Sequence, residues 1–290
     1  QVYGKWHTEP VQGVAILDRF RGCSRVKNPC MYCDIEDLSP RFTDPTLFWK
    51  DVDKAKTQVG ADFFYVVGDS INAPNLERIL KARLKGIGKV EFMMYLQAAE
   101  TTPKLVNIAK KLGVVRFNMG IDSGSDTTLQ RLKGPRDKVE KSTYALSLLQ
   151  NAGITVYASF VLGAPGENEK TLSETIAFTK KLVDGEYLAG IEAQPLLPFP
   201  KSIAGDMLLN PIRAYEYTSR MGVQIRNKSL LQEMNSRYGT IPFPNFAAMA
   251  RDWATIFCDI SYGRLVEASS LINAYAESKG VSGGSAWIEK

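Results

Sequence analysis

The stretch DFFYVVGDSINAPNLERILKARLKGIGKVEFMMYL, residues 62–96, decides the fold class. Its apolar runs at 62–68 and 89–96 predict two strands, and the segment 73–88 between them predicts a helix. A strand, a crossover helix and a second strand form a right-handed βαβ unit in which the two strands are parallel. The stretch therefore predicts a parallel sheet.

The same alternation continues on both sides of this stretch. Further strands are predicted at 13–20, 114–121, 154–162 and 187–195, and further helices at 42–60, 102–113, 137–153 and 167–185. Six strands are too few for a closed eight-stranded barrel. The predicted fold is therefore α/β, an open and partial (β/α)6 TIM-like barrel, in which a polar loop follows the strand at 114–121.

The regular alternation ends near residue 205, which divides the chain into three parts. Residues 1–12 are interpreted as an N-terminal linker, 13–205 as the barrel, and 206–290 as a helical C-terminal cap that closes or flanks the barrel mouth. The first residue is Gln1 rather than methionine. We therefore expect the chain to be part of a longer polypeptide.

Charge and hydropathy narrow the classes of function. The net charge is +5, but the 36 Lys and Arg residues are spread along the chain without a basic block, so nucleic acid is not favoured as a partner. An anionic small substrate fits this charge equally well. No apolar run reaches the length of about 20 residues that a membrane-spanning helix needs, and no secretory leader opens the chain. We therefore expect a soluble, cytoplasmic protein with no membrane partner.

Three of the four cysteines, Cys23, Cys30 and Cys33, lie within eleven residues directly after the first predicted strand. A chain of this size does not need disulfides to fold, so a metal site explains the cluster better. Structural zinc would require a fourth ligand, and the only histidine is His7. Three thiolates suit a cubane cluster of four irons in which one iron stays open to another ligand. Cys258, in an apolar stretch, is interpreted as a small buried residue.

Polar and turn residues follow each of the other predicted strands. Asp69, Ser70, Gln97, Asp122 and Ser159 stand at or near these strand ends. Any one of them could serve only to shape a turn. However, the carboxyl ends of parallel strands are where α/β barrels bind ligands, and the cysteines stand at the first of those ends. This face of the barrel is therefore the predicted active site.

Several stretches resemble the radical S-adenosylmethionine (radical SAM) enzymes, over about residues 10–205. Tyr32, directly before Cys33, matches the usual cluster loop of that family. The other matching stretches are GDSIN (68–72), RFNMGIDSGSDTTLQRLKG (116–134), FVLGAPGENEKTLSETIAF (160–178) and PLLPFPKS (195–202). They are similar to the subgroup of methylthiotransferases, coproporphyrinogen oxidase-like proteins and cobalamin-binding radical enzymes.

The chain departs from the family pattern at two positions. Six residues separate Cys23 from Cys30, where the family usually has three. The ligands need only converge in space, so the additional residues can loop out at modest entropic cost. Asp122 stands where the subgroup normally carries Glu or Gln.

The resemblance implies a 4Fe-4S cluster held by Cys23, Cys30 and Cys33, with an open iron that chelates the amino and carboxylate groups of S-adenosylmethionine (SAM). The implied cofactor-binding side chains are Tyr32, Asp69, Ser70, Gln97, Asp122, Lys133 and Ser159.

Among these, Asp122 and Ser159 are expected to bind the ribose, and Asp69 or Ser70 the amino group. Lys133 or Arg131 is expected to bind the carboxylate. Arg25 and Lys27, in the cysteine loop, are interpreted as ordinary loop charges.

The resemblance further implies reductive cleavage of SAM to a 5′-deoxyadenosyl radical that acts on a small organic or peptide substrate, with an electron donor such as flavodoxin or ferredoxin. No residue is assigned to the chemistry on the substrate. The opening YGKWHTEPVQGVAIL (3–17) looks like the linker that follows a cobalamin domain, so cobalamin and methyl transfer are expected if such a domain precedes it.

Two other functions stay open. The first is a tRNA-modifying enzyme of the methylthiotransferase kind, although such enzymes usually carry three more cysteines and a small RNA-binding β-barrel. The second is a non-enzymatic zinc or iron-sulfur module that binds nucleic acid.

Overall fold

The computed structural model describes residues 14–18, 20–25, 28–35, 40–239 and 245–284. The linker predicted at 1–12, the possible zinc ligand His7 and the loop residue Lys27 lie outside these ranges. Within them, no helix combines the length and the apolar character that a membrane span requires.

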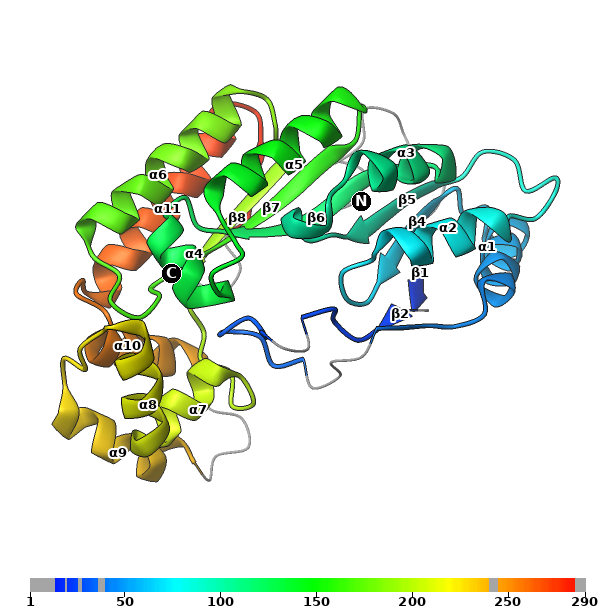
Figure 1. Cartoon of the computed structure of the whole chain (residues 1–290). Helices are drawn as coiled ribbons and strands as arrows, with labels where there is room; N and C mark the ends of the chain where they lie inside the picture. Colours follow the sequence, from blue (N-terminus) through cyan, green and yellow to red (C-terminus); the bar gives the residue numbers. More distant parts are fainter. Residues whose placement is uncertain (1–13, 19, 26–27, 36–39, 240–244, 285–290) are drawn as a thin grey trace.

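A parallel seven-stranded sheet forms the centre of the molecule, in the order β1-β4-β5-β6-β7-β8-β9 (Figure 1). Its strands are β1 (Val14–Asp18), β4 (Phe63–Val67), β5 (Glu91–Tyr95), β6 (Val114–Asp122), β7 (Thr155–Leu162), β8 (Gly190–Pro195) and β9 (Ser282–Gly284). The first six confirm the predicted strands, and their order along the sheet follows the chain. The sheet does not close on itself, so the predicted partial barrel is confirmed.

Helices pack on one face of this sheet. They are α1 (Pro45–Val59), α2 (Ala73–Lys81), α3 (Pro103–Leu112), α5 (Val139–Asn151) and α6 (Glu169–Asp184). Proline at the first or second helical position and a capping side chain fix where three of them begin, with Asp44, Asn72 and Thr102 as N-caps. Their buried residues join those of the strands in one hydrophobic core.

The opposite face of the sheet carries a different set of side chains, and we call it the inner face. Along β6, β7 and β8, buried apolar residues that face the helices alternate with half-buried residues that face the other way. The inner face is polar near its centre, where it carries Asn118, Tyr157, Ser159, Glu192 and Gln194.

Two small elements flank the cysteine loop. The strands β2 (Phe20–Arg21) and β3 (Arg41–Phe42) pair with each other in an antiparallel ribbon, and a short 3-10 helix, η2 (Ala98–Glu100), follows β5. A further helix, α4 (Asp126–Lys133), stands where a polar loop was predicted. That prediction is wrong because Leu129 and Leu132 bury one side of this mostly polar segment.

The C-terminal region is helical, as predicted. It contains α7 (Ile203–Leu209), α8 (Pro211–Met221), α9 (Lys228–Tyr238), α10 (Phe246–Phe257) and α11 (Tyr262–Ser278). Figure 1 shows α7 to α10 grouped away from the sheet, whereas α11 lies alongside α6. Ser269 and Asn273 of α11 bond to the backbone of Ala193 in β8. The strand β9 then joins β8, so this region also completes the sheet; the predicted division at residue 205 stays a prediction.

Candidate functional site

The candidate site lies at the carboxyl ends of the parallel strands. Asp69 and Ser70 follow β4, Gln97 follows β5, Asp122 ends β6, and Ser159 lies on β7. Residues 28–35 of the cysteine loop reach the same end of the sheet. There the backbone N–H of Met31 donates to the carbonyl of Leu132 at 2.8 Å, next to Lys133.

Side chains from two strand ends hold the first part of the cysteine loop. Asp69 accepts a hydrogen bond from the backbone N–H of Gly22 at 2.5 Å. Gln97 Nε2 lies 3.4 Å from the sulfur of Cys23. Both Asp69 and Gln97 were predicted as cofactor ligands, and here each contacts the residues that lead into the cysteine loop.

The three clustered thiols are half-buried and influence one another electrostatically. Burial raises the pKa of Cys30, and the Asp122 and Cys23 charges raise it further, whereas the Lys133 and Arg25 charges lower it. Burial also raises the pKa of Cys33 to about 11. Among the described residues, no three Cys, His, Asp or Glu side chains converge closely enough to hold one metal ion.

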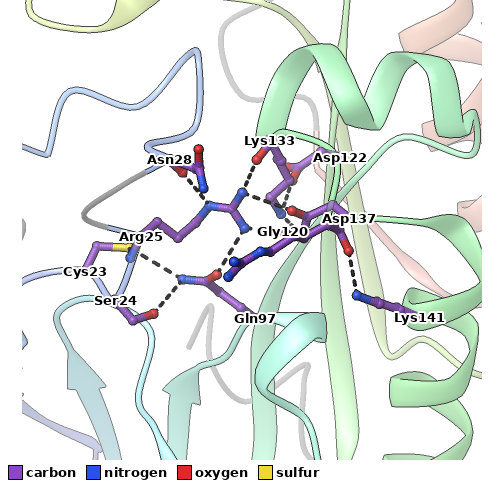
Figure 2. A network of polar contacts seen from close by, with 11 residues as sticks. Cys23, Ser24, Arg25, Asn28, Gln97, Gly120, Asp122, Lys133, Asp137 and Lys141 are labelled. Atoms are coloured by element: carbon purple, nitrogen blue, oxygen red, sulfur yellow. Dashed lines mark hydrogen bonds and ion pairs between the residues drawn. The ribbon is translucent and has the colours of Figure 1, made fainter.

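Arg25 links the cysteine loop to the region after β6, as Figure 2 shows. Its guanidinium forms an ion pair with Asp137 at 2.9 Å, in which both side chains are about nine-tenths buried, and it also bonds to the carbonyl of Lys133. Its Nη1 donates to Gln97 Oε1 at 3.4 Å. The interpretation of Arg25 as an ordinary loop charge is wrong, because Arg25 makes bonds that connect three segments.

Asp122 and Lys133 form a buried ion pair at the end of β6 (Figure 2). Only 1% of Asp122 and 7% of Lys133 are exposed. Lys133 also donates to the carbonyl of Gly120 at 2.8 Å. Burial alone would lower the pKa of Lys133, but the Asp122 and Cys30 charges raise it above its ordinary value.

Tyr32 brings the cysteine loop against the same carboxylate. Burial raises the pKa of the Tyr32 phenol well above its ordinary value, and the neighbouring Asp122 charge raises it further. The phenol therefore stays protonated and is available as a hydrogen-bond donor. The structure thus brings Tyr32, Asp122 and Lys133 together.

Residues 163–166, which we call the GAPG loop, follow β7 and are held by a buried carboxylate. Glu167, 1% exposed, accepts hydrogen bonds from the N–H groups of Gly163 at 2.8 Å and Ala164 at 3.3 Å. Burial raises the pKa of Glu167. The sequence analysis did not single out Glu167; an acidic residue between a Gly-Ala-Pro-Gly turn and a helix was the available signal.

Residues from α4 and α10 complete the support of the GAPG loop. Arg131 donates to the carbonyls of Pro165 and Gly166 at 2.9 and 3.0 Å, so it is engaged with the loop backbone. Trp253 donates its indole N–H to the carbonyl of Gly163 at 2.8 Å. Cys258 is buried, as predicted, with its sulfur 3.4 Å from the same carbonyl.

The residues present suit the implied cluster and SAM in their chemistry. Three thiols share one loop, and the electrostatic effect of each on its neighbours places them in one region. The Ser70 hydroxyl is buried and has no hydrogen-bond partner in the described part of the chain. A bound polar group would satisfy that oxygen. Ser159 stands half-buried on the inner face, beside Gly120 of β6.

Comparisons with known proteins agree with this arrangement. The family profile described as the Radical SAM superfamily matches residues 18–179, which is more than half of the chain. A comparison with curated proteins finds no match.

Three solved structures are similar in fold. TsrM, a radical SAM methyltransferase from Kitasatospora setae solved with cobalamin and a 4Fe-4S cluster, has a TM-score of 0.58 at 15% identity, over 69% of this chain and 40% of that one. The cobalamin-dependent radical enzyme OxsB, with aqua-cobalamin bound, has a TM-score of 0.53 at 19% identity, over 72% and 31%. Coproporphyrinogen III oxidase from Escherichia coli has a TM-score of 0.50 at 10% identity, over 79% and 59%. The chain therefore spans less than two thirds of each of these proteins.

Proposed function

This chain belongs to the radical SAM superfamily, and on that premise we propose that it cleaves SAM reductively and directs the resulting 5′-deoxyadenosyl radical to a small organic or peptide substrate. Membership of this family implies an enzyme with a 4Fe-4S cluster and SAM as its cofactors. The observation that supports the proposal is the placement of Cys30, one of three cysteines in a single loop, near the buried Asp122–Lys133 pair at the carboxyl end of the sheet.

Cys23, Cys30 and Cys33 are the residues that we propose as cluster ligands. When bound, the reduced cluster supplies the electron that breaks a carbon–sulfur bond of SAM. Thiols bind metal as thiolates, so binding must release the protons of these cysteines. Burial raises the pKa of Cys30 and opposes that release, whereas the positive charges of Lys133 and Arg25 act in the opposite direction and favour it.

The side chains around the Asp122–Lys133 pair are those that we propose for SAM. Asp122 can accept hydrogen bonds from ribose hydroxyls, as a carboxylate does in dinucleotide sites, and Ser159 supplies a second polar contact. Lys133 can bind the carboxylate as a cation, and the unpartnered hydroxyl of Ser70 can bond to the amino group. Asp69 and Gln97 support this site through the cysteine loop.

Anaerobic reconstitution with iron and sulfide tests the cluster. We expect the protein to bind iron and sulfide and to turn brown, whereas Cys30→Ala loses both the chromophore and SAM cleavage. Cys258→Ala is the matched control, because it removes a buried thiol that we do not propose as a ligand. Tight binding of zinc without any uptake of iron would refute the proposal.

The role of Asp122 is tested by measuring SAM binding to the reconstituted protein. Asp122→Ala is expected to weaken SAM binding while iron and sulfide content stays at the wild-type level. Unchanged SAM binding would show that Asp122 does not hold the ribose. The electron donor is tested by supplying reduced flavodoxin or ferredoxin in place of dithionite and measuring 5′-deoxyadenosine.

Methyl transfer is the reaction that we propose if the natural polypeptide carries a cobalamin domain ahead of Gln1. TsrM and OxsB, two proteins of similar fold, were solved with cobalamin bound, and this chain spans 40% and 31% of their lengths. Cobalamin binding by the natural full-length protein tests this form of the proposal. A full-length protein that binds no cobalamin would refute it.

A further inference from the structure

The inner face of the sheet carries polar side chains next to Ser159, one of the proposed SAM residues. Gly120 of β6, Ser159 of β7 and Glu192 of β8 stand side by side in the register of the three strands. Gln194 lies two residues further along β8, opposite Val161. The side chains of Ser159, Glu192 and Gln194 point away from the helices, since their neighbours in sequence are the ones buried against them.

Glu192 is a half-buried carboxylate without a counterion. Within the described ranges it forms no hydrogen bond and no ion pair, and burial alone raises its pKa. Taking a charged group partly out of water is unfavourable unless a partner compensates for the lost hydration. Such a group on the inner face is therefore a candidate for binding a ligand.

Small residues flank Glu192 in the sheet. Its two neighbours in the sheet register are small, Ser159 on β7 and Gly284 on β9, so neither strand places a large side chain beside the carboxylate. The Oε1 atom of Gln194 is buried and has no hydrogen-bond partner in the described part of the chain. Two acceptors without donors thus stand on the same face of β8.

The charges nearby favour a cation as the missing partner. Tyr157, one step below Ser159 on β7, has its pKa raised to about 12 by burial and by the Glu192 charge, so it is a neutral hydroxyl. Two described cations near this level are engaged elsewhere. Lys133 donates to the carbonyl of Gly120 at 2.8 Å and pairs with Asp122, and Arg116 of β6 donates to Thr155 at 3.2 Å. A neutral donor would leave the charge of Glu192 uncompensated, whereas a cationic nitrogen would neutralise it.

We propose that Glu192 and Gln194 bind a protonated nitrogen of the substrate, either an ammonium or a guanidinium group. This inference rests on the proposed function and specifies the substrate class of that site. Gly120, at the level of Glu192, precedes Asp122 by two residues along β6. The Asp122 carboxylate turns back toward Gly120, where an added Cβ would meet it at 3.1 Å, so a nitrogen bound at this level lies next to the proposed SAM residues.

Binding of simple cations to the reconstituted protein tests the inference. The probes are pentylammonium and pentylguanidinium, with neutral 1-pentanol as their uncharged counterpart, and binding is followed by saturation-transfer NMR in the presence of SAM. We expect at least one cation to bind about tenfold more tightly than pentanol, and Glu192→Gln to lose about tenfold in that affinity. Glu140→Gln, which removes an exposed carboxylate on α5, is the matched control and should bind as the wild type does.

Equal binding of the cation by wild type and Glu192→Gln, or a preference for pentanol, would overturn the inference. Gln194→Met removes the second acceptor without changing the charge and should weaken cation binding several-fold. It serves as an independent test if Glu192→Gln does not fold, and unchanged binding would then refute the inference. Probe binding does not depend on SAM cleavage. A wild type that binds the cation but neither assembles a cluster nor cleaves SAM would therefore refute the proposed function alone.

Discussion

Replacement of Glu167 by alanine tests how the GAPG loop is held. The carboxylate is almost fully buried and accepts four hydrogen bonds. Two come from the backbone N–H groups of Gly163 and Ala164, at 2.8 and 3.3 Å. The others come from the hydroxyls of Thr128 and Thr171, at 3.1 and 2.9 Å. Alanine removes the acceptor of all four donors at once.

The expected destabilisation follows from the donors that are left buried. Thr171 keeps a second acceptor, the carbonyl of Asn168 at 3.1 Å. The other three donors lose their only recorded acceptor, and a buried unsatisfied donor costs about 1 to 3 kcal/mol. Removing the carboxylate also removes the cost of burying it, which offsets part of that loss. We therefore expect Glu167→Ala to lower the free energy of unfolding by about 3 to 5 kcal/mol.

Glu167→Gln is the matched control, because its amide oxygen can still accept from the two backbone N–H groups. Its NH2 group can donate to the threonine hydroxyls, which accept as well as donate. The expected loss is below about 1.5 kcal/mol. Urea unfolding followed by far-UV circular dichroism measures both variants, provided that the m-value is unchanged. A loss below about 1 kcal/mol in the alanine variant, or equal losses in both, would refute the assignment of the loop support to this carboxylate.

Three further predictions concern the Arg25–Asp137 ion pair and the buried groups that hold the GAPG loop. Asp137→Asn removes the charge that pairs with the buried Arg25, so it should lower the free energy of unfolding in urea by about 2 to 4 kcal/mol. It should also make the cysteine loop more sensitive to trypsin, and an unchanged digestion pattern would contradict the prediction. Trp253→Phe deprives the GAPG loop of one donor and should cost about 1 to 2 kcal/mol by the same unfolding assay, and no loss would show that water replaces the indole. Burial raises the pKa of Glu167 above its ordinary value of 4.5, so the folded state holds the proton of this carboxyl more tightly than the unfolded state does. The wild type should therefore lose stability relative to Glu167→Gln as the pH rises above 4.5. A difference in unfolding free energy between the two proteins that stays constant with pH would contradict this.

The sheet could be predicted from the sequence because β4 and β5 are short, mostly apolar runs and each strand stands between turn residues. Glycine or proline marks the ends of most helices between the strands. The helix α4 escaped prediction because only two leucines in eight residues mark its buried side. The strand β9 escaped because Ser-Gly-Gly carries no apolar pattern, and its place in the sheet depends on the turn after α11.

The location of a site residue was predictable where the residue ends a strand, as Asp122 does at the end of β6, because the strand ends lie together at one edge of the sheet. It was not predictable where a contact joins distant parts of the chain. Arg25 and Asp137 are separated by 112 residues, and no local pattern in either stretch indicates the other. The support of the GAPG loop by Trp253 likewise depends on how α10 packs, which a single sequence does not encode in any local spacing.

The local backbone accounts for the aspartate at position 122, where the related subgroup normally carries Glu or Gln. Its φ is 65°, in the left-handed region, and the pairing of β6 with β7 shifts register between Gly120 and Asp122. Aspartate enters this region more readily than most residues with a longer side chain, because its short polar side chain can bond locally. A side chain at position 120 would meet the carboxylate at 3.1 Å, so Gly120 leaves the space into which it turns. The bulge therefore directs a short carboxylate to Lys133, whose Nζ also donates to the carbonyl of Gly120 at 2.8 Å.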